Sequence, residues 1–335
     1  MSTKKVTKST MINEAKAVTA ATVAGVAVGA VSLAAAASYI VAKKLTKIAL
    51  DRETPKAAKG AEKMISGTSF DKEFLSTMVD SAEGLLQKEH ETVEITSHDG
   101  TKLMGHWFKH ENEKRIIIAM HGWRTTWNKD FGMIADFWFN NDCSVLFVEQ
   151  RGQNNSGGDY MGFGLIERYD CLDWIEWVNE RTGGNTPIYL GGVSMGAATV
   201  LMAAGLELPE NVKGIIADCG FTSPHDIWKH VANNNLHMTY GFKGVVADKL
   251  CRQKIQMGSD EYSTIDALSK TNIPVMLIHG TDDHFVPVEM SYRNYRACNG
   301  PKRLLIVPGA DHGMSYYIEK DRYEYEVKQF WKDFC

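Results

Sequence analysis

The sequence lacks the cysteine patterns that mark a zinc site or a disulfide framework. Its six cysteines are widely separated, and no two of them form a CxxC pair. Zinc ligands and disulfide-rich domains need cysteines at close or regular spacing, so neither class of protein fits this chain. Cys143 and Cys219 fall in or beside strand-like apolar runs, where a free thiol behaves as a small hydrophobic group. The pattern mildly favours a reducing compartment and predicts no metal site.

An excess of basic residues is also missing. The chain has 37 Lys and Arg against 41 Asp and Glu, which gives a net charge of −4. Nucleic-acid binding needs a basic face, so we expect no nucleic-acid partner. The hydrophobic share of 44% and the charged share of 23% are those of an ordinary globular protein.

Charge is absent altogether from one segment, residues 17–42. About 20 apolar residues suffice to cross a bilayer as a helix. The segment therefore predicts a single-pass transmembrane anchor that follows an N-terminal tail of residues 1–16. Lys and Arg are more numerous just after the segment than before it. By the positive-inside rule, this difference favours a cytoplasmic location for the residues that follow the segment.

Two alternatives to an anchor remain open. Ala35 and Ala37 form an A-x-A pattern, which is typical of the cleavage site of a secretory signal. A buried soluble helix is the other alternative, although such a helix would have no polar face. If the segment is an anchor, deletion of residues 1–50 is expected to leave a soluble, folded and active remainder.

The rest of the chain divides into a connector and a large domain. Residues 43–90 are charged, without dense Gly or Pro, and predict a helical connector. Two alternating strands with a turn at Asp99-Gly100 predict an antiparallel hairpin. Short apolar runs separated by helical segments follow, which is typical of a parallel sheet covered by helices on both faces. We expect an α/β domain over residues 91–335, with a mostly parallel sheet of about eight strands and an insertion at residues 221–270.

Polar side chains gather at the carboxyl ends of the expected strands, where open parallel sheets place their functional groups. Ser194 follows one strand within the stretch GVSMG. The acidic pair Asp282 and Asp283 follows the next-to-last strand, and His312 follows the last. A serine, a carboxylate and a histidine at matching positions favour nucleophilic catalysis over a simple turn at Ser194.

Each of these residue types has a chemical role. A serine hydroxyl is a weak nucleophile and needs a neighbouring base such as histidine. A carboxylate holds the imidazole in the tautomer that accepts the serine proton. Gly192 and Gly196 suit a sharp turn from strand to helix, which exposes the serine oxygen. The helix expected to begin near Met195 would direct its free N–H groups toward a developing oxyanion.

With these residues in place, the sequence resembles the α/β-hydrolase superfamily over residues 90–335. Within it, the chain is similar to membrane-anchored bacterial hydrolases of the prolyl-oligopeptidase-like, acyl-hydrolase branch, often labelled serine aminopeptidase-like. The family's G-x-S-x-G motif matches GVSMG and implies Ser194 as the nucleophile. Its H-G-x-x-D-x-x-V-P motif matches HGTDDHFVP and implies Asp283 as the acid. Its G-x-x-H motif matches GADH and implies His312 as the base.

The resemblance also implies an oxyanion hole and a lid. The family's HG after the third strand matches His121 and Gly122, which implies the backbone N–H groups of Trp123 and Met195 as the oxyanion donors. The insertion at residues 221–270 stands where this fold commonly carries a lid.

One loop departs from the family's pattern. The family's D-x-R-G-x-G-x-S-x-G reads EQRGQNNSGG here, with Glu149, Gln153 and Asn154 in place of the usual Asp, His and Gly. That loop is structural in the family, so the departure bears on the shape of the substrate site more than on catalysis.

The expected function is that of a serine hydrolase that cleaves an ester, thioester or amide through an acyl-enzyme intermediate, most simply a carboxylesterase. No metal or organic cofactor is needed, and small-molecule, lipid-like and peptide substrates all remain open. An aminopeptidase on the same fold is one alternative, and it would need an acidic or polar anchor for a substrate ammonium group. A catalytically silent binding protein is another, because fold alone does not imply function.

Overall fold

The computed structural model describes residues 35–53, 65, 67–68 and 70–334. Most of the predicted anchor, residues 17–34, lies outside the described residues. Within the described ranges, no helix is long and apolar enough to span a bilayer.

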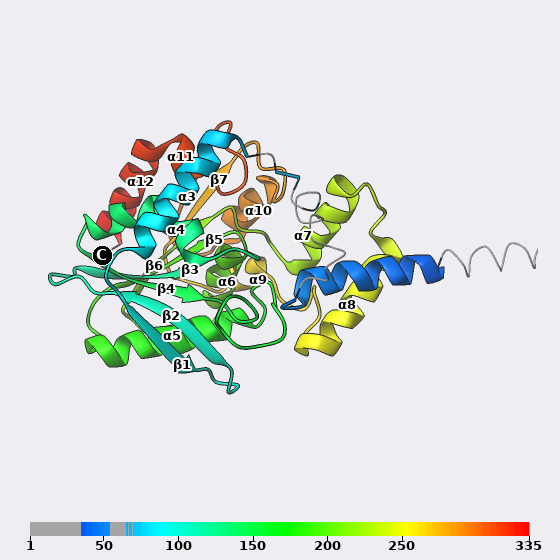
Figure 1. Cartoon of the computed structure of the whole chain (residues 1–335), viewed down its shortest axis with the longest axis horizontal. Helices are drawn as coiled ribbons and strands as arrows, with labels where there is room; N and C mark the ends of the chain where they lie inside the picture. Colours follow the sequence, from blue (N-terminus) through cyan, green and yellow to red (C-terminus); the bar gives the residue numbers. More distant parts are fainter. Residues whose placement is uncertain (1–34, 54–64, 66, 69, 335) are drawn as a thin grey trace, which may run out of the picture.

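An eight-stranded sheet forms the centre of the protein (Figure 1). Its strand order is β1-β2-β4-β3-β5-β6-β7-β8. The pairs β1–β2 and β2–β4 are antiparallel, and all the other pairs are parallel. The prediction of a mostly parallel eight-stranded sheet is therefore confirmed. The strands are β1 Glu91–Thr96, β2 Lys102–Phe108, β3 Arg115–Met120, β4 Cys143–Glu149, β5 Ile188–Val193, β6 Val212–Asp218, β7 Val275–Gly280 and β8 Lys302–Val307.

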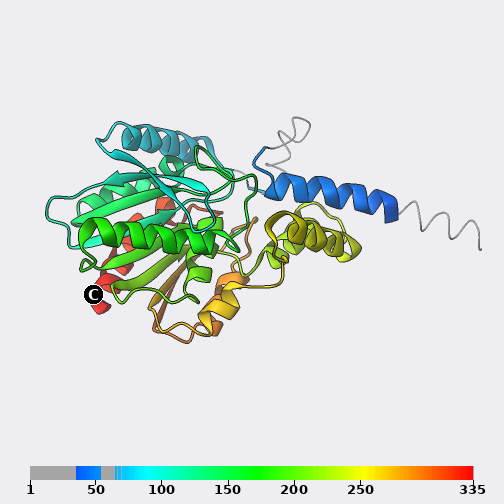
Figure 2. The same cartoon turned by 90° about the horizontal axis from the view of Figure 1, so that it is seen from below.

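Helices cover both faces of this sheet, as the continuous apolar sequence of its central strands predicts (Figure 2). On one face, Phe131 of α4 and Phe330 of α12 belong to a single apolar cluster. On the other face, Trp174 of α5 and Leu201 of α6 belong to a second cluster. The helices of the body are α3 Lys72–Leu86, α4 Trp127–Phe139, α5 Glu167–Thr182, α6 Met195–Ala203, α10 Glu289–Ala297, α11 Ser315–Ile318 and α12 Lys320–Asp333.

A helical insertion separates β6 from β7. Its elements are α7 Pro224–His230, the π-helical turn η2 Val231–Asn235, α8 Gly241–Ile255 and α9 Thr264–Leu268. The hydroxyl of Ser223 accepts a hydrogen bond from the Asp226 N–H and so caps the start of α7. Helices α7 and α8 pack on each other at one end of the molecule, whereas α9 packs on α6 (Figure 1). We refer to α7, η2 and α8 as the lid, after the role that the resemblance implies, and we assign α9 to the body.

Residues 35–50 form a helix that packs on the domain, and the second half of this helix lies in the segment predicted as a helical connector. Ala42, Thr46, Ile48 and Leu50 are buried, whereas the three lysines of this helix are exposed. The buried positions recur at helical spacing, so one face of the helix is turned toward the lid. Figure 1 shows this helix, in blue, lying alongside α8. The folded unit therefore includes part of the segment that the sequence assigns to an anchor and a connector.

Helix α3 also belongs to the domain, because it packs tightly against α4. Asp71 caps its N-terminus by accepting a hydrogen bond from the Phe74 N–H at 2.7 Å. Its face carrying Phe74 and Leu85 is buried. A Cβ atom added to Gly132 in α4 would lie 2.7 Å from the carbonyl carbon of Ser81 in α3, so the close approach of the two helices requires glycine there.

Candidate active site

Ser194 lies on a sharp turn between the end of β5 and the start of α6. Its backbone has φ 55° and ψ −115°, an unfavourable conformation for a residue with a side chain. A Cβ atom added to Gly196 would lie 1.8 Å from the Met120 carbonyl oxygen, and one added to Gly192 would lie 2.4 Å from Gly196. The turn therefore requires a glycine on each side of the serine, as the sequence pattern predicts.

The structure brings Ser194, His312 and Asp283 into one hydrogen-bonded chain. The Ser194 hydroxyl lies 2.9 Å from His312 Nε2, and His312 Nδ1 lies 2.7 Å from the Asp283 Oδ2 atom. His312 comes from the loop after β8, and Asp283 comes from the loop after β7. With Nδ1 protonated and donating to Asp283, Nε2 is left to accept the serine proton.

Asp283 is held by more groups than His312 alone. Its Oδ1 atom accepts the backbone N–H groups of Phe285 at 2.9 Å and Val286 at 2.8 Å. Burial alone would raise its pKa, but the charge and hydrogen bond of His312, together with His279, hold the pKa well below its usual range. Asp282 points elsewhere, since it is exposed and accepts a hydrogen bond from the Thr281 hydroxyl. The geometry therefore selects Asp283 from the acidic pair.

His279, which precedes the Asp283 loop at the end of β7, has a positioning role. Its side chain is fully buried, and Nε2 lies 2.7 Å from the Val286 carbonyl and 3.1 Å from Asp283 Oδ2. Since both of these atoms are acceptors, Nε2 carries the proton and Nδ1 accepts from the Ser291 hydroxyl at 2.7 Å. His279 thus fixes the loop that presents Asp283 to His312.

His312 has a pKa well above the ordinary histidine value. Burial opposes its protonation, but the carboxylate of Asp283 outweighs this effect and raises the pKa. Cys219 lies beside the imidazole, and burial raises the pKa of its thiol to about 11, so the thiol is protonated at neutral pH. Phe285 packs edge-on against the His312 ring, with centroids 5.0 Å apart, and shields it from water.

The predicted oxyanion donors are the backbone N–H groups of Trp123 and Met195. Trp123 lies within the loop after β3, and Met195 is the first residue of α6. The N–H of Gly122 donates to Asp130 Oδ2 at 2.7 Å, and the N–H of Arg124 donates to Gln153 Oε1 at 2.6 Å. The Trp123 N–H between them, and the Met195 N–H at the start of α6, have no acceptor among the described residues. Both donors are thus free to bind a developing oxyanion.

The loop that departs from the family's pattern braces this oxyanion loop. Gln153 holds the Arg124 N–H, and the Asn154 side-chain amide donates to the Thr125 carbonyl at 3.0 Å. Glu149 instead accepts from His106 Nε2 and from Asn155. Gln153 and Asn154 therefore help to position the segment that follows β3, whereas Glu149 does not.

His121 organises the same segment from inside. Its Nδ1 lies 2.8 Å from the Gly122 carbonyl, and the backbone N–H of Gln150 donates to its Nε2 at 3.1 Å. Burial lowers the pKa of His121, so the ring is neutral with its proton on Nδ1.

Two contributions to the site carry no sequence signal. Asp130 accepts from the Gly122 N–H and the Thr125 hydroxyl, and burial raises its pKa. The helix of residues 35–50 accepts the Trp123 indole N–H at the Ala49 carbonyl, at 3.0 Å. Arg124 also donates from its guanidinium to the Ile48 carbonyl at 2.7 Å. Both contributions depend on chain segments that come together only in the fold.

A cleft with a volume of about 470 Å³ opens in front of Ser194 and His312. Its walls come from the oxyanion loop, from α4, and from α3 with the residues that precede it, including Phe74 and Met78. Asp130 is the only acidic residue among its described lining residues, and Arg124 and Lys129 are the cationic ones.

Two groups of described residues could bring three metal-ligating atoms together. One consists of Cys219, Asp283 and His312, of which Asp283 and His312 are hydrogen-bonded to each other and Cys219 lies beside the His312 ring. The other consists of His98, Asp170 and Asp173. In that group, Asp170 is paired with Arg151 and Asp173 with His98. Ion pairs and hydrogen bonds that are already present therefore account for these side chains in both groups.

Relatives match most of the chain. The uncharacterised protein YqkD of Bacillus subtilis is 27% identical over 256 residues, which span 75% of this chain and 82% of that protein. The human protein ABHD12B is 30% identical over 183 residues, which span 51% of this chain and 48% of that protein.

Solved structures are similar over about three quarters of the chain. The esterase Pf2001 of Pyrococcus furiosus has a TM-score of 0.61 at 21% identity, covering 75% of this chain and 93% of that one. An acylaminoacyl peptidase of Pyrococcus horikoshii has a TM-score of 0.54 at 16% identity, covering 75% and 43%. At these identities the likeness shows the fold alone.

The sheet, the serine turn and these likenesses define an α/β hydrolase. Residues 129–334, more than half of the chain, match the prolyl oligopeptidase family. The chain belongs to this family of esterase- and peptidase-type hydrolases, and the resemblance to it stated from the sequence is confirmed.

Proposed function

We propose that the protein is a serine hydrolase that cleaves a carboxylic ester through an acyl-enzyme intermediate. The observation that carries the proposal is the continuous chain of hydrogen bonds from Ser194 through His312 to Asp283. The open cleft in front of Ser194 gives a substrate access to this chain.

In the first half of the reaction, Ser194 Oγ attacks the ester carbonyl carbon while His312 Nε2 takes the hydroxyl proton. The Trp123 and Met195 N–H groups bind the oxyanion of the tetrahedral intermediate. Collapse of this intermediate breaks the bond to the alkoxy group, which leaves as an alcohol with the proton from His312. In the second half, water gives a proton to His312 and attacks the acyl group, and Ser194 regains its proton as the acid leaves.

Asp283 accepts from Nδ1 throughout and stabilises the imidazolium that forms twice in each turnover. The raised pKa of His312 fits this role, because the same carboxylate that orients the ring also favours its charged form.

An ester fits the cleft better than an aminopeptidase substrate does. A peptide N-terminus is an ammonium group, and it needs an accessible acceptor. Asp130 is the only acid among the described lining residues, and both of its oxygens already accept hydrogen bonds from the oxyanion loop. The aminopeptidase remains the second candidate because the family includes peptidases.

The test uses a fluorophosphonate probe with the unmodified protein, Ser194→Ala and the control Ser76→Ala, an exposed serine on α3. Loss of labelling in Ser194→Ala alone, with ester turnover lower by about a millionfold, is the expected result. Labelling that persists in Ser194→Ala would overturn the assignment of the nucleophile. Faster cleavage of aminoacyl p-nitroanilides than of p-nitrophenyl butyrate would favour the peptidase.

Membrane attachment is the second part of the proposal, and it rests on the uncharged sequence of residues 17–42. We expect the full-length chain to sediment with membranes at its unprocessed mass, with the hydrolase on the cytoplasmic side. A secreted form that starts near residue 38 would identify a cleaved signal instead.

A further inference from the structure

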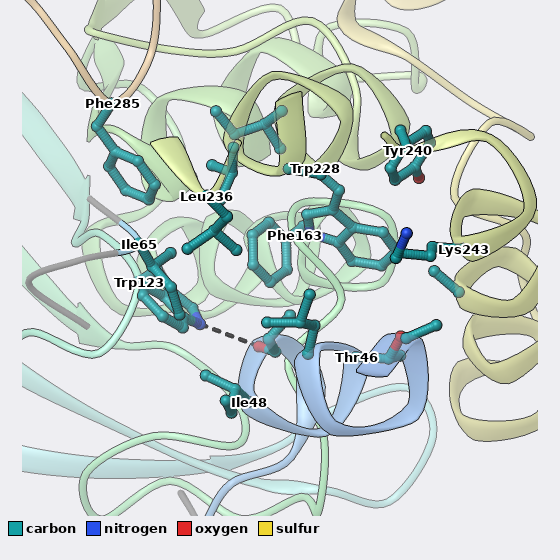
Figure 3. Close-up of a pocket in the computed structure, with 17 residues that line it drawn as sticks. Thr46, Ile48, Ile65, Trp123, Phe163, Trp228, Leu236, Tyr240, Lys243 and Phe285 are labelled. Atoms are coloured by element: carbon teal, nitrogen blue, oxygen red, sulfur yellow. Dashed lines mark hydrogen bonds between the residues drawn. The ribbon is translucent and has the colours of Figure 1, made fainter. Parts of the chain in front are cut away.

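A second pocket adjoins the catalytic cleft and shares Trp123 and Phe285 with it. Residues 35–50 form one wall of this pocket and contribute Ala42 and Thr46. The lid forms the opposite wall and contributes Trp228 and Tyr240 (Figure 3). We call it the helix-walled pocket. From Ala42 to Ala49 the wall follows roughly 10 Å of helix, so the pocket is elongated.

The two ends of the helix-walled pocket differ in polarity. Figure 3 shows Trp123, Ile65 and Phe285 together at one end, and Trp123 and Phe285 also line the catalytic cleft. Thr46 and Tyr240 lie at the other end, where Lys243 also lines the pocket. The lining between them is almost wholly apolar.

Three polar side-chain atoms that belong to residues lining this pocket are buried without a hydrogen-bond partner. They are Thr46 Oγ1, Trp228 Nε1 and the Tyr240 hydroxyl oxygen. Thr46 is only 3% exposed and Tyr240 only 8%. Buried polar groups are normally satisfied, so three unpartnered groups along one pocket indicate a ligand that supplies acceptors. Burial raises the pKa of Tyr240, so its phenol is protonated and can donate.

We propose that the helix-walled pocket binds the aliphatic acyl chain of the substrate, and that its polar end hydrogen-bonds an oxygen function carried near the far end of that chain. The substrate class is then an ester of a medium-length, terminally oxygenated fatty acid. This inference rests on the proposed function, because the acyl group must be attached to Ser194.

The route from Ser194 into the pocket passes between two aromatic rings. The centroids of Trp123 and Phe285 are 6.4 Å apart, so a chain enters when the Phe285 side chain rotates. The Trp123 backbone N–H is a predicted oxyanion donor, and its indole N–H is bound to the Ala49 carbonyl. An acyl carbonyl in the oxyanion hole therefore lies next to the entrance of the pocket.

The first experiment compares p-nitrophenyl esters of acetate, octanoate and omega-hydroxyoctanoate, with the full-length protein in lipid nanodiscs. Detergent is avoided because its alkyl chain would compete for the pocket. Ala42→Phe fills the pocket and should lower the ratio of kcat/KM for octanoate over acetate by at least about tenfold. Lys44→Phe, on the exposed side of the same helix, should leave that ratio unchanged.

The second experiment tests the polar end with two nearly isosteric variants. Tyr240→Phe and Thr46→Val each remove one hydroxyl and keep the shape of the pocket. Each should reduce the preference for omega-hydroxyoctanoate over octanoate by about three- to tenfold, the effect of one lost hydrogen bond. If neither variant alters this preference, the polar part of the proposal is wrong.

The two proposals fail in different ways. Absence of probe labelling and of acetate ester hydrolysis would overturn the proposed function. Normal labelling and acetate turnover, together with equal chain-length ratios in the unmodified protein and Ala42→Phe, would overturn the helix-walled pocket alone. Binding of methyl omega-hydroxyoctanoate to Ser194→Ala, followed by the change in tryptophan fluorescence to which Trp123 and Trp228 in the pocket contribute, gives a readout without turnover. Equally tight binding in Ser194→Ala with and without Ala42→Phe would also contradict the proposal.

Discussion

N-terminal truncation tests how strongly residues 35–50 stabilise the hydrolase domain. We compare a protein that begins at residue 35 with one that begins at residue 51. The shorter deletion leaves the described helix intact. The longer deletion removes that helix together with the carbonyl groups of Ile48 and Ala49, which accept hydrogen bonds from Arg124 and Trp123.

The cost of the longer deletion can be worked from the groups it removes. Ile48 is 7% exposed and Leu50 is fully buried, and burial of such side chains contributes roughly 1.5–3 kcal/mol each. The loss of the charged hydrogen bond from Arg124 to Ile48 costs about 1.5–3 kcal/mol more. These three losses add up to roughly 4.5–9 kcal/mol. A whole domain is stable by only roughly 5–15 kcal/mol, so the longer deletion should remove most of this stability.

Thermal unfolding followed by circular dichroism measures this cost. We expect the protein that begins at residue 51 to aggregate, or to unfold at least about 10 °C below the one that begins at residue 35. It should also hydrolyse acetate esters more slowly, because Trp123 loses the contact that orients it. Equal unfolding midpoints and equal turnover in the two proteins would refute the packing described for residues 35–50 and restore the expectation drawn from the sequence.

Three further predictions concern the site. Asp283→Asn should lower kcat by about ten-thousandfold, whereas the exposed Asp282→Asn should have little effect, and p-nitrophenyl acetate kinetics that show the reverse order would refute the choice between them. Because hydrolysis needs neutral His312, whose pKa Asp283 raises, kcat/KM should fall as the pH drops through that raised value, and in Asp283→Asn this acid limb of the pH profile should move to lower pH. Gly196→Ala should lower the free energy of unfolding by more than about 3 kcal/mol, because its Cβ would lie 1.8 Å from the Met120 carbonyl oxygen. The control Gly191→Ala should unfold at nearly the unmodified temperature, because its Cβ would make only an ordinary 3.5 Å contact.

Local sequence predicts the sheet well because strand burial is written into consecutive residues. The run RIIIAM can be satisfied only between two covering layers, and β3 is buried on both faces. The same logic places Ser194, Asp283 and His312 at one edge of the sheet, because the carboxyl ends of parallel strands meet there. The structure brings these three side chains within hydrogen-bonding distance.

Contacts between distant segments could not be predicted in this way. Residues 35–42 of the uncharged segment belong to an amphipathic helix that the sequence does not reveal, because alanine suits a bilayer and a packed interface equally well. Asp130 and Arg124 resemble ordinary surface charges in the sequence, and only the fold gives them backbone partners. The choice between Asp282 and Asp283 rests on a motif in the sequence, whereas in the structure it follows from the direction of each side chain.

The close packing of α3 on α4 has a consequence for the alcohol part of an ester. If the acyl chain occupies the helix-walled pocket, the leaving group lies in the cleft, where Phe74 and Met78 of α3 face Met133 of α4. The separation of these walls depends on the missing side chain at Gly132. Substitution of this one residue would push α3 outward and widen the cleft, which offers a route to a variant that accepts bulkier alcohols without any change to the reacting groups.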